Sequence, residues 1–460
     1  MTPVPQACTA RSSLPFLCFT WAYLLAAGML FGQVGEETTS EYGGPAILGR
    51  GAGAFNQPGE PIKFRPYISL DGIYEEGLRA PSVRLDGSIP RQNSYGGQVA
   101  VGLSGTRAWR KSVVSVDYRG DYRHYTSNRY FNGSNQNLTL GLRHALSKRL
   151  VVSIQEAAGT TSRGAGQFGG YSQGLAFNPE LVDVPQDELF DGRTTYFVTQ
   201  GDLVFQKTAR LSVGLGGGNF IIRRQSSALY GVTGGRARGT LAYRLSRRTT
   251  LTSAYDFTNF KFTQGFGGSD VHGVKLGLSH ALTRTLEIAL SAGANRVETL
   301  GLTRVTLDPE IAAIIGQRVG TEVVYRVNYL PDLMARIRKE FERGALAISY
   351  TRGISGGNGL LLTSAQKSIN GGYTYQALRR LAFSLSGGHS TYSSLAQTLG
   401  KFQTYRGSVG LNYRLTGSLH AHSRFDYFRP SIANTGFRQD RQRFTVGFRY
   451  APGDIPLAFW

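Results

Sequence analysis

Arginine recurs at every second or fourth position of several polar stretches, and this spacing gives the sequence its clearest chemistry. A guanidinium group keeps its positive charge at any physiological pH and can bind a carboxylate or a phosphate through two parallel hydrogen bonds. Residues two apart project from the same face of a β-strand. If such strands enclose a lumen, the sequence predicts a basic wall that favours the passage of anions. The thirteen arginines are Arg119, Arg123, Arg143, Arg236, Arg238, Arg244, Arg336, Arg338, Arg406, Arg414, Arg424, Arg443 and Arg449.

Six acidic residues fall in the same alternating phase, so the wall is not purely basic. They are Asp117, Asp121, Asp256, Glu287, Glu340 and Asp426. Two interpretations stay open at this point. The arginines either form a path that selects anionic solutes, or they pair with the carboxylates and simply fill a polar interior.

Other motifs that carry chemistry are sparse. The chain has no phosphate-loop or HExxH pattern, and the glycine run at Gly214–Gly218 lies inside a strand pattern, where close strand packing explains it better than nucleotide binding. His420 and His422 are spaced as two metal ligands would be, but no further histidine or carboxylate cluster completes a site. We therefore expect no enzyme activity, no cofactor and no metal.

Alternation of apolar and polar residues defines the elements that must hold these side chains. In the last such segment, Phe444, Phe448 and Tyr450 alternate with Arg443 and Arg449. The segments at 114–125, 285–295 and 405–415 follow the same rule over ten or more residues. Strands of this length exceed the usual five or six residues and match the number that crosses a bilayer at a tilt.

The alternating segments come in pairs joined by short turns. The turns centre near Trp109, Ser147, Thr208, Arg247, Arg284, Arg343, Arg379 and Thr416, at a basic period near 37 residues. Two longer intervals predict long loops near Thr160–Arg193 and Glu298–Asn328, both on the side opposite the short turns. The first loop contains the glycine-rich segment Gly164–Phe177. The second contains Asp308–Ile315, which is expected to form a helical turn with Asp308 as its N-cap. Each of these segments either folds inward as a constriction or stays at the surface.

Composition and charge agree with a β-rich protein in anionic surroundings. Of 460 residues, 60 are Gly, 24 are Tyr and 25 are Phe, and 51 basic against 30 acidic residues give a net charge of +21. This mixture argues against a disordered chain or a coiled coil. A charge-free run at Leu14–Phe31 predicts a secretory signal. Both cysteines, Cys8 and Cys18, lie within that segment, so disulfides, thiolate zinc sites and cysteine catalysis are not expected in the mature chain.

These features together predict four segments. Residues 1–32 form a signal peptide with a cleavage site between 28 and 32, residues 33–63 a periplasmic lead-in, residues 64–451 a transmembrane β-barrel, and residues 452–460 a C-terminal tail. One strand, eight hairpins and a last strand give eighteen strands, or sixteen if the count near Glu322–Phe341 is in error. The fold class is all-β, an antiparallel up-and-down barrel with both ends on the periplasmic side.

From about Phe64 to Ala451, the sequence resembles the porin-like outer-membrane β-barrels of Gram-negative bacteria. The resemblance rests on the hairpin period, the loop asymmetry and the terminal strand Arg443–Tyr450, and it assigns no subfamily. Such barrels commonly end in an aromatic residue that the barrel-assembly machinery reads. Here Ala451–Trp460 follows Tyr450 and carries two prolines, Pro452 and Pro456, which cannot extend a ladder strand. Either Tyr450 or Trp460 is therefore the terminal aromatic.

The resemblance implies location in the outer membrane and contact with its lipid and lipopolysaccharide. The leading hypothesis for function is a channel for passive diffusion of small hydrophilic, anionic solutes. A second hypothesis is an export pore for an anionic polysaccharide, since alginate-export channels are similar in having eighteen strands and an arginine-rich lumen. A third is a non-conducting barrel whose extracellular loops bind or scaffold a partner. No nucleic-acid partner is expected.

Overall fold

Eighteen long antiparallel strands and one short one make up nearly all of the described chain. The computed structural model describes residues 62–79, 91–127, 131–161, 193–226, 229–263, 265–306, 308, 310, 313, 316, 318–357, 359, 361–378, 380–395, 401–433, 438–452 and 455–457. The strands are β1 (Ile62–Arg79), β2 (Arg91–Ala108), β3 (Ser112–Tyr125), β4 (Gly133–Ala145), β5 (Leu150–Thr161), β6 (Thr194–Gln206), β7 (Leu211–Arg224), β8 (Gly231–Arg244), β9 (Thr249–Thr263), β10 (Gly268–Ala281), β11 (Leu286–Thr306), β12 (Val319–Phe341), β13 (Gly344–Ser355), β14 (Ser364–Leu378), β15 (Leu381–Ser394), β16 (Phe402–Arg414), β17 (Leu419–Ile432), β18 (Arg441–Tyr450) and β19 (Ile455–Leu457).

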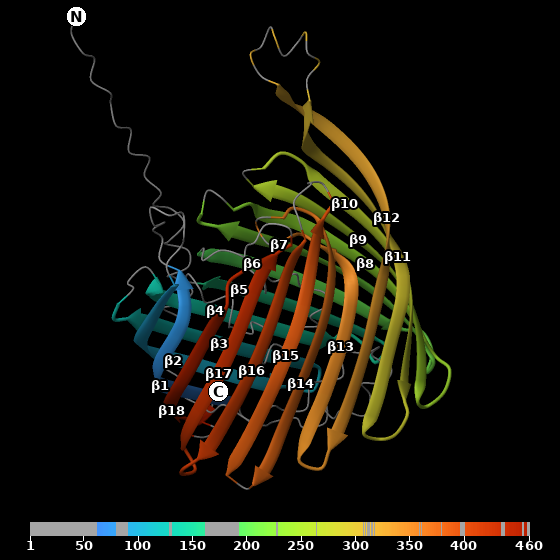
Figure 1. The fold of residues 1–460 in the computed structure, drawn as a ribbon. Coiled ribbons are helices and arrows are strands. Elements are labelled where there is room, and N and C mark those ends of the chain that lie inside the picture. The colour runs from blue at the N-terminus through green and yellow to red at the C-terminus, as the bar shows by residue number, and fades with distance from the viewer. Residues whose placement is uncertain are drawn as a thin grey trace, which may run out of the picture.

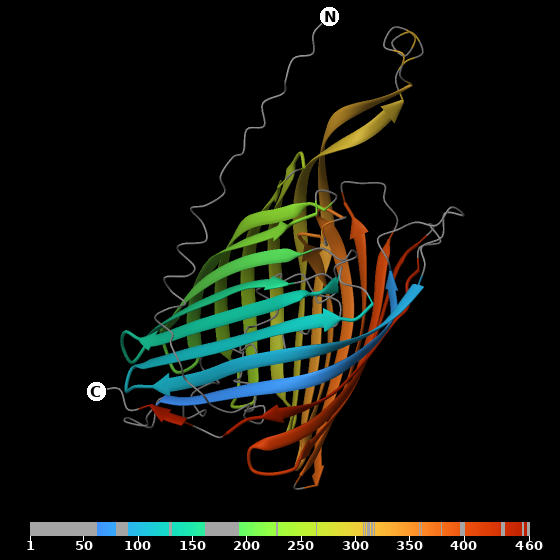
Figure 2. The same cartoon turned by 90° about the vertical axis from the view of Figure 1, so that its left-hand side faces the viewer.

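The strands close into a barrel because the first pairs with the eighteenth. Every strand from β1 to β17 is hydrogen-bonded to the next in antiparallel register, and β1 pairs with β18 from Ile68↔Tyr450 to Glu76↔Gln442. Figures 1 and 2 show the tilted strands curving round to this seam. All eight short turns lie where the sequence predicts them, and Glu322–Phe341 is part of a single strand. The prediction of an eighteen-strand closed barrel is confirmed.

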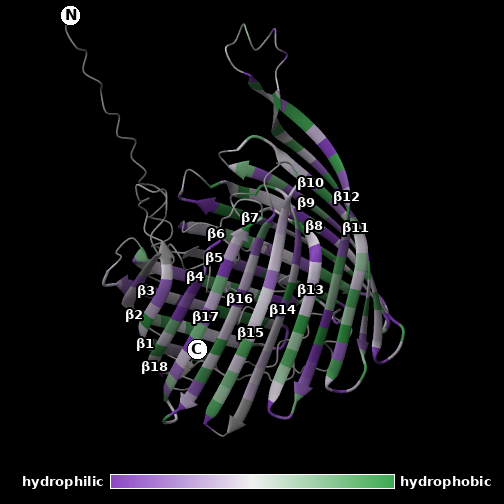
Figure 3. Ribbon diagram, viewed as in Figure 1, coloured by the Kyte–Doolittle hydropathy of each residue, from purple (hydrophilic) through white to green (hydrophobic). Residues whose placement is uncertain are grey.

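The two faces of the wall differ in polarity. Large apolar side chains alternate along the strands and are exposed on the outer face, as at Leu215, Leu276 and Phe448. Figure 3 shows the resulting alternation of hydrophobic and hydrophilic residues along β13–β17. A strand pleat sends successive side chains to opposite faces, so a two-residue period in the sequence becomes a polar inside and an apolar outside. In the described part of the chain, no helix is long and apolar enough to span a membrane.

The hairpin β11–β12 projects beyond the rest of the barrel. β11 pairs with β12 from Leu286↔Lys339 to Thr306↔Val319, whereas β13 pairs with β12 only as far as Leu333. Figures 1 and 2 show this hairpin rising clear of its neighbours. The prediction of a loop over Glu298–Asn328 is therefore wrong. An interval longer than the hairpin period does not distinguish a longer loop from longer strands.

The helical turn predicted at Asp308–Ile315 falls at the tip of the projecting hairpin, not inside the barrel. Asp308 Oδ1 accepts a hydrogen bond from the Glu310 backbone N–H at 3.2 Å, and Glu310 and Ala313 are helical, as an N-cap at Asp308 implies. Of the two positions left open for this turn, inside the mouth or at the surface, the structure has the surface one, because the ladder carries the turn past the rim. Gly164–Phe177, the other inward candidate, lies outside the described residues.

The segment after Tyr450 adds a short strand to the seam. In β19, Pro456 stands opposite Lys63 of β1, although the sequence predicts that Pro456 cannot join a ladder. The strand pairs with β1 alone, and proline is tolerated on such an edge because the missing N–H would have pointed away from the ladder. β1 itself begins at Ile62, two residues before the predicted start. The predicted signal peptide lies outside the described residues, as does the lead-in up to residue 61.

Candidate functional site on the inner wall of the barrel

The arginines of the alternating segments lie on the inner face of the wall. On β18, for example, Phe444, Phe448 and Tyr450 are exposed on the outer face, so Arg443 and Arg449 project to the opposite side. The same parity holds on the other strands. Arg119 and Arg123 lie on β3, Arg143 on β4, Arg236, Arg238 and Arg244 on β8, Arg336 and Arg338 on β12, Arg406 and Arg414 on β16, and Arg424 on β17.

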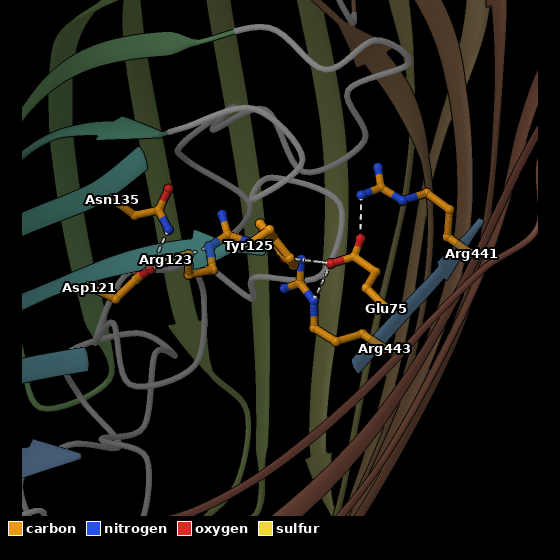
Figure 4. A network of polar contacts seen from close by, with 7 residues as sticks. All are labelled: Glu75, Asp121, Arg123, Tyr125, Asn135, Arg441 and Arg443. Carbon is orange, nitrogen blue, oxygen red and sulfur yellow. Dashed lines mark hydrogen bonds and ion pairs between the residues drawn. The ribbon is translucent and has the colours of Figure 1, made fainter. Parts of the chain in front are cut away.

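A buried carboxylate joins the first and last strands of the barrel. Glu75 of β1 is fully buried, and its Oε1 accepts a hydrogen bond from Arg441 Nη2 at 2.5 Å. Its Oε2 accepts hydrogen bonds from Arg443 Nη2 at 2.9 Å and from the Tyr125 hydroxyl at 2.6 Å. Tyr125 reaches Glu75 from β3, across the intervening strand β2. Figure 4 shows these four side chains converging; we call them the seam cluster.

A glycine sets the backbone beside the seam cluster. The β1–β2 register shifts between Glu75 and Leu78, and Gly77 between them has a φ of 85°. Only glycine adopts this region freely, so Gly77 allows the bulge. The Gln439 side chain donates a hydrogen bond to the Gly77 carbonyl at 3.0 Å. The bulge thereby ties this end of β1 to the segment just before β18.

A second carboxylate continues the polar network on β3 and β4. Asp121 Oδ2 accepts a hydrogen bond from the Asn135 amide at 2.6 Å and lies 3.6 Å from Arg123 Nε. Arg123 is almost completely buried and lies beside Tyr125 of the seam cluster in Figure 4. Arg123 is therefore part of a packed wall and is not available to a passing solute.

On the opposite arc, one carboxylate is surrounded by three cations. Asp256 of β9 lies 3.3 Å from Arg236 Nη2, 3.4 Å from Arg238 Nε and 3.1 Å from Lys275 Nζ. Lys275 also approaches Asp332 of β12 at 3.8 Å. Asp202 of β6 lines a recess together with Arg236 and Arg238, so three cations meet three carboxylates and the arc is close to neutral.

The glycine run of β7 lies next to this arc. Gly216 and Gly218 stand directly opposite Arg238 and Arg236 in the ladder, and they line a recess of about 30 Å³ on the inner face. A recess of that size holds about one water molecule. The run therefore makes room beside the two arginines, in keeping with strand packing and not with a nucleotide site.

Three further arginines pair with a carboxylate on their own strand. Arg119 lies 3.1 Å from Asp117, Arg338 2.8 Å from Glu340 and Arg424 2.7 Å from Asp426, each pair being two residues apart. Such partly exposed pairs contribute little stability, about 0–1 kcal/mol each. They orient the guanidinium groups along the wall.

At the short-turn end, arginines flank a histidine in a single row. Arg414 of β16 stands opposite His420 of β17, which in turn stands opposite Arg449 of β18. The Arg449 guanidinium lies 4.8 Å from the centre of the Tyr67 ring. Of the remaining arginines, Arg336 is exposed, Arg143 and Arg406 are partly exposed, and Arg244 donates to the backbone carbonyl of Ser246 at 3.2 Å.

The histidine pair considered from the sequence as metal ligands has a different arrangement. His422 Nε2 lies 3.0 Å from Asp71 Oδ1 of β1. Within the described ranges, no three His, Cys, Asp or Glu side chains are grouped to hold a metal ion. His422 and Asp71 thus form a second side-chain link between the two ends of the barrel wall.

Sequence reasoning missed several members of these networks. The sequence predicts the first strand near residues 64–74, so Glu75 lies one residue beyond it, and Arg441 continues the alternation of Arg443 and Arg449 by one step. Stepping back two residues from Arg443 would have found Arg441. Nothing in the sequence indicates that Glu75 is its partner, because the two are 366 residues apart.

The long-loop half of the interior is apolar. Tyr196, Val198, Phe220, Ile222, Val232, Phe260, Val271 and Val297 are buried on the inner faces of β6–β11 and contact one another. Leu330, Ile354 and Leu395 pack against them from β12, β13 and the segment after β15. We call this set the mouth cluster. A water-filled lumen does not require such a core, so this half of the barrel is packed more like a soluble domain.

The loop between β13 and β14 connects opposite sides of the barrel. The Gly359 carbonyl accepts a hydrogen bond from the Tyr230 backbone N–H at 2.8 Å, and Thr363 Oγ1 donates to Ser269 Oγ at 2.6 Å. Leu361, in the same loop, belongs to a buried cluster with Tyr392 of β15 and Phe402 of β16. The described residues of 356–363 therefore bridge β8–β10 and β15–β16.

Glycine allows the loop to approach the wall. Gly359 has a φ of 89°, and a Cβ there would lie 2.7 Å from Arg224 Nε. Arg224 in turn donates to the Tyr230 carbonyl at 2.5 Å. The sequence does not mark this loop as long or unusual, since it fits within the basic hairpin period.

A closed antiparallel barrel of eighteen strands, apolar outside and polar inside, is an outer-membrane β-barrel protein. The expected fold and location are thereby confirmed. Three solved structures are similar at 12% sequence identity: OccAB4 of Acinetobacter baumannii, OccK2 (OpdF) of Pseudomonas aeruginosa, and the outer membrane protein opdK from Pseudomonas aeruginosa. Their TM-scores are 0.40, 0.40 and 0.39, with 86%, 85% and 84% of this chain covered and 99%, 98% and 98% of theirs. No protein-family model and no curated protein matches the sequence.

Proposed function

We propose that the chain is an outer-membrane channel through which small hydrophilic anions diffuse passively along an arginine-bearing wall. The observation that carries this proposal is the row at the short-turn end, where Arg414 of β16 and Arg449 of β18 stand on either side of His420 on the inner wall. An excess of fixed positive charge concentrates anions and lowers their energy in a low-dielectric lumen.

The wall keeps its basic excess when the residues missed by sequence reasoning are included. Asp71, Glu75, Asp202 and Asp332 add acidic groups, and Arg441 and Lys275 add basic ones, so the thirteen arginines still outnumber their partners. Arg123, Arg441 and Arg443 are buried in ion pairs and are excluded as contacts for solute. The more accessible arginines at the short-turn end, Arg414 and Arg449, are the better candidates.

The test is the zero-current potential of the refolded mature chain in a planar bilayer under a salt gradient. Conductance with a potential that favours anions is the expected result. We expect the triple variant Arg406→Ser/Arg414→Ser/Arg449→Ser to lose most of this preference. Arg443 stays unchanged in the test because it binds Glu75 and its loss would disturb the fold.

A charge-matched control separates the lumen from the rest of the surface. The variant Arg210→Ser/Arg247→Ser/Arg284→Ser removes three exposed arginines from the short turns. Its ion preference should stay close to that of the unmodified chain. Equal selectivity in the unmodified chain and the lumen variant would rule out the arginine wall as the selective element.

A non-conducting barrel is the second candidate, and the loop at 356–363 favours it. This loop joins different arcs through Gly359, Leu361 and Thr363, and its Gly356 lies against Phe260 and Val232 of the mouth cluster. The same arrangement suits an export pore for an anionic polysaccharide that opens only with periplasmic partners. A correctly folded barrel that conducts no ions would favour either of these over a porin.

A further inference from the structure

Two cations stand side by side on the outer face, at the edge away from the short turns. Arg352 of β13 and Lys367 of β14 are direct partners in the ladder. Both belong to the outward set, because Ile348 and Ile369, which share their parity on the two strands, are exposed apolar residues. The side chains of directly opposed residues lie close together, about 5 Å apart at their Cβ atoms.

Neither cation has a partner among the described residues. Beyond the backbone ladder, no side-chain hydrogen bond or ion pair joins Arg352 or Lys367 to any of them. Other outward cations near this rim are paired: Arg296 lies 2.5 Å from Glu298, and Arg429 lies 3.5 Å from Asp440. Like charges placed opposite each other on a sheet destabilise it. An anion bound between Arg352 and Lys367 would relieve that repulsion.

The pair lies at the level where lipid headgroups meet the apolar band. Arg352 is the ninth residue of β13, counted from the turn at 342–343. At about 3.4 Å per residue and a tilt near 40°, this sets it roughly 20 Å above the start of the strand. The apolar band of such barrels is about 25 Å tall, and the outward residues below Arg352 are Leu346, Ile348 and Tyr350. Arg352 is therefore near the rim of the band on the long-loop side.

Aromatic side chains flank the pair on the same face. His389 and Tyr405 stack with ring centres 4.3 Å apart, in the row next to Lys367 on β15 and β16. On the other side, the projecting strand β12 presents Tyr329, which is 73% exposed. Aromatic rings with a polar atom suit the boundary between hydrocarbon and water, where sugars and headgroups lie.

We propose that Arg352 and Lys367 form a phosphate-binding site for lipopolysaccharide in the outer leaflet. The Arg352 guanidinium would bind phosphate oxygens bidentately and the Lys367 ammonium would add a point charge. The phosphorylated sugars of the lipid would lie toward Tyr329. Outer-leaflet lipopolysaccharide is the anionic lipid available at this level, because the short turns face the periplasm. The site is independent of whether the barrel conducts.

The test measures lipid binding to the folded mature barrel in detergent by native mass spectrometry. The probes are bisphosphorylated lipid A, lipid A stripped of its phosphates, and phosphatidylglycerol. We expect the unmodified barrel to prefer bisphosphorylated lipid A. The variant Arg352→Gln/Lys367→Gln should bind it at least tenfold more weakly.

Matched variants keep the result independent of folding. Lys148→Gln/Arg149→Gln removes the same two residue types from a short turn on the opposite rim and should bind lipid A normally. Lys367→Arg should also bind normally, whereas Lys367→Glu should not. Equal lipid A binding by the unmodified barrel and the Gln variant would overturn the site. Equal binding of lipid A and phosphatidylglycerol by the unmodified barrel would overturn its assignment to lipopolysaccharide.

Discussion

Glu75 illustrates how a carboxylate is kept inside a membrane protein. Burial removes it from water, and two guanidinium groups and a hydroxyl replace the lost hydration. Such an arrangement adds modest net stability as a whole, because desolvation offsets much of the attraction. Removing one member is different, since the remaining charges are then buried without a counter-charge.

Replacing Glu75 by Gln should therefore destabilise the barrel by about 3–5 kcal/mol, because Arg441 and Arg443 would lose their only shared carboxylate. The matched control is Glu76→Gln, one residue along on the exposed outer face of the same strand. The control should change stability by less than about 0.5 kcal/mol. Urea unfolding followed by tryptophan fluorescence measures both. Identical midpoints for the two variants would contradict the structural role of the seam cluster.

At the scale of elements, the alternating pattern was sufficient to locate strands and faces. The period of two placed Arg443 and Arg449 on one side of β18 and Phe444 and Phe448 on the other, because the pleat allows no other arrangement. The pattern says nothing about which strands lie opposite one another across the lumen. For this reason neither the mouth cluster nor the contacts of the 356–363 loop could be predicted. The bulge at Gly77 also lay beyond its reach.

The 356–363 loop resembles a lid more than a surface connection. On one side it makes hydrogen bonds to Tyr230 and Ser269. On the other side it packs against the apolar cluster of Tyr392 and Phe402. A short segment held at several points across an opening restricts what passes. The segment is the element whose removal should change the mouth most while leaving the strand ladder intact.

Replacing residues 356–363 by a Gly-Ser linker should raise single-channel conductance, or create conductance if the unmodified barrel has none. The β13–β14 register from Gly344↔Tyr375 to Ser355↔Ser364 should survive, because these pairs do not involve the loop. The control makes the same replacement at 307–318, at the tip of the projecting hairpin. Conductance of the control should match that of the unmodified chain. If both replacements change the conductance by the same amount, the loop at 356–363 does not restrict the pore.

At the scale of the whole molecule, the barrel depends on its closure. Nine register pairs join β1 to β18, and only three more join β1 to β19. His422 with Asp71 and the seam cluster reinforce the main joint from inside. The residues after Ala451 therefore add little to closure.

Ending the chain after Ala451 should leave a barrel that still folds and resists heat in detergent. Tyr450, exposed at the end of β18, would then serve as the terminal aromatic. The measurement is the shift in gel mobility between heated and unheated samples after assembly into lipid. The point variant Trp460→Ala, in the full chain, isolates the alternative aromatic. Failure of both variants to assemble would assign the terminal signal to Trp460.

The closing joint also sets the order in which the molecule can form. Arg443 and Glu75 are 368 residues apart in sequence, whereas each strand from β1 to β17 pairs with the strand that follows it in the chain. Loop-closure entropy and high contact order make such a joint slow to form. The free edge of β1 must therefore wait until nearly the whole chain is present, and during that wait it offers unpaired backbone to any other strand. The counter-charges of Glu75 lie on β18, the last long strand to be made. The carboxylate of Glu75 is therefore neutralised only in the final step of barrel closure.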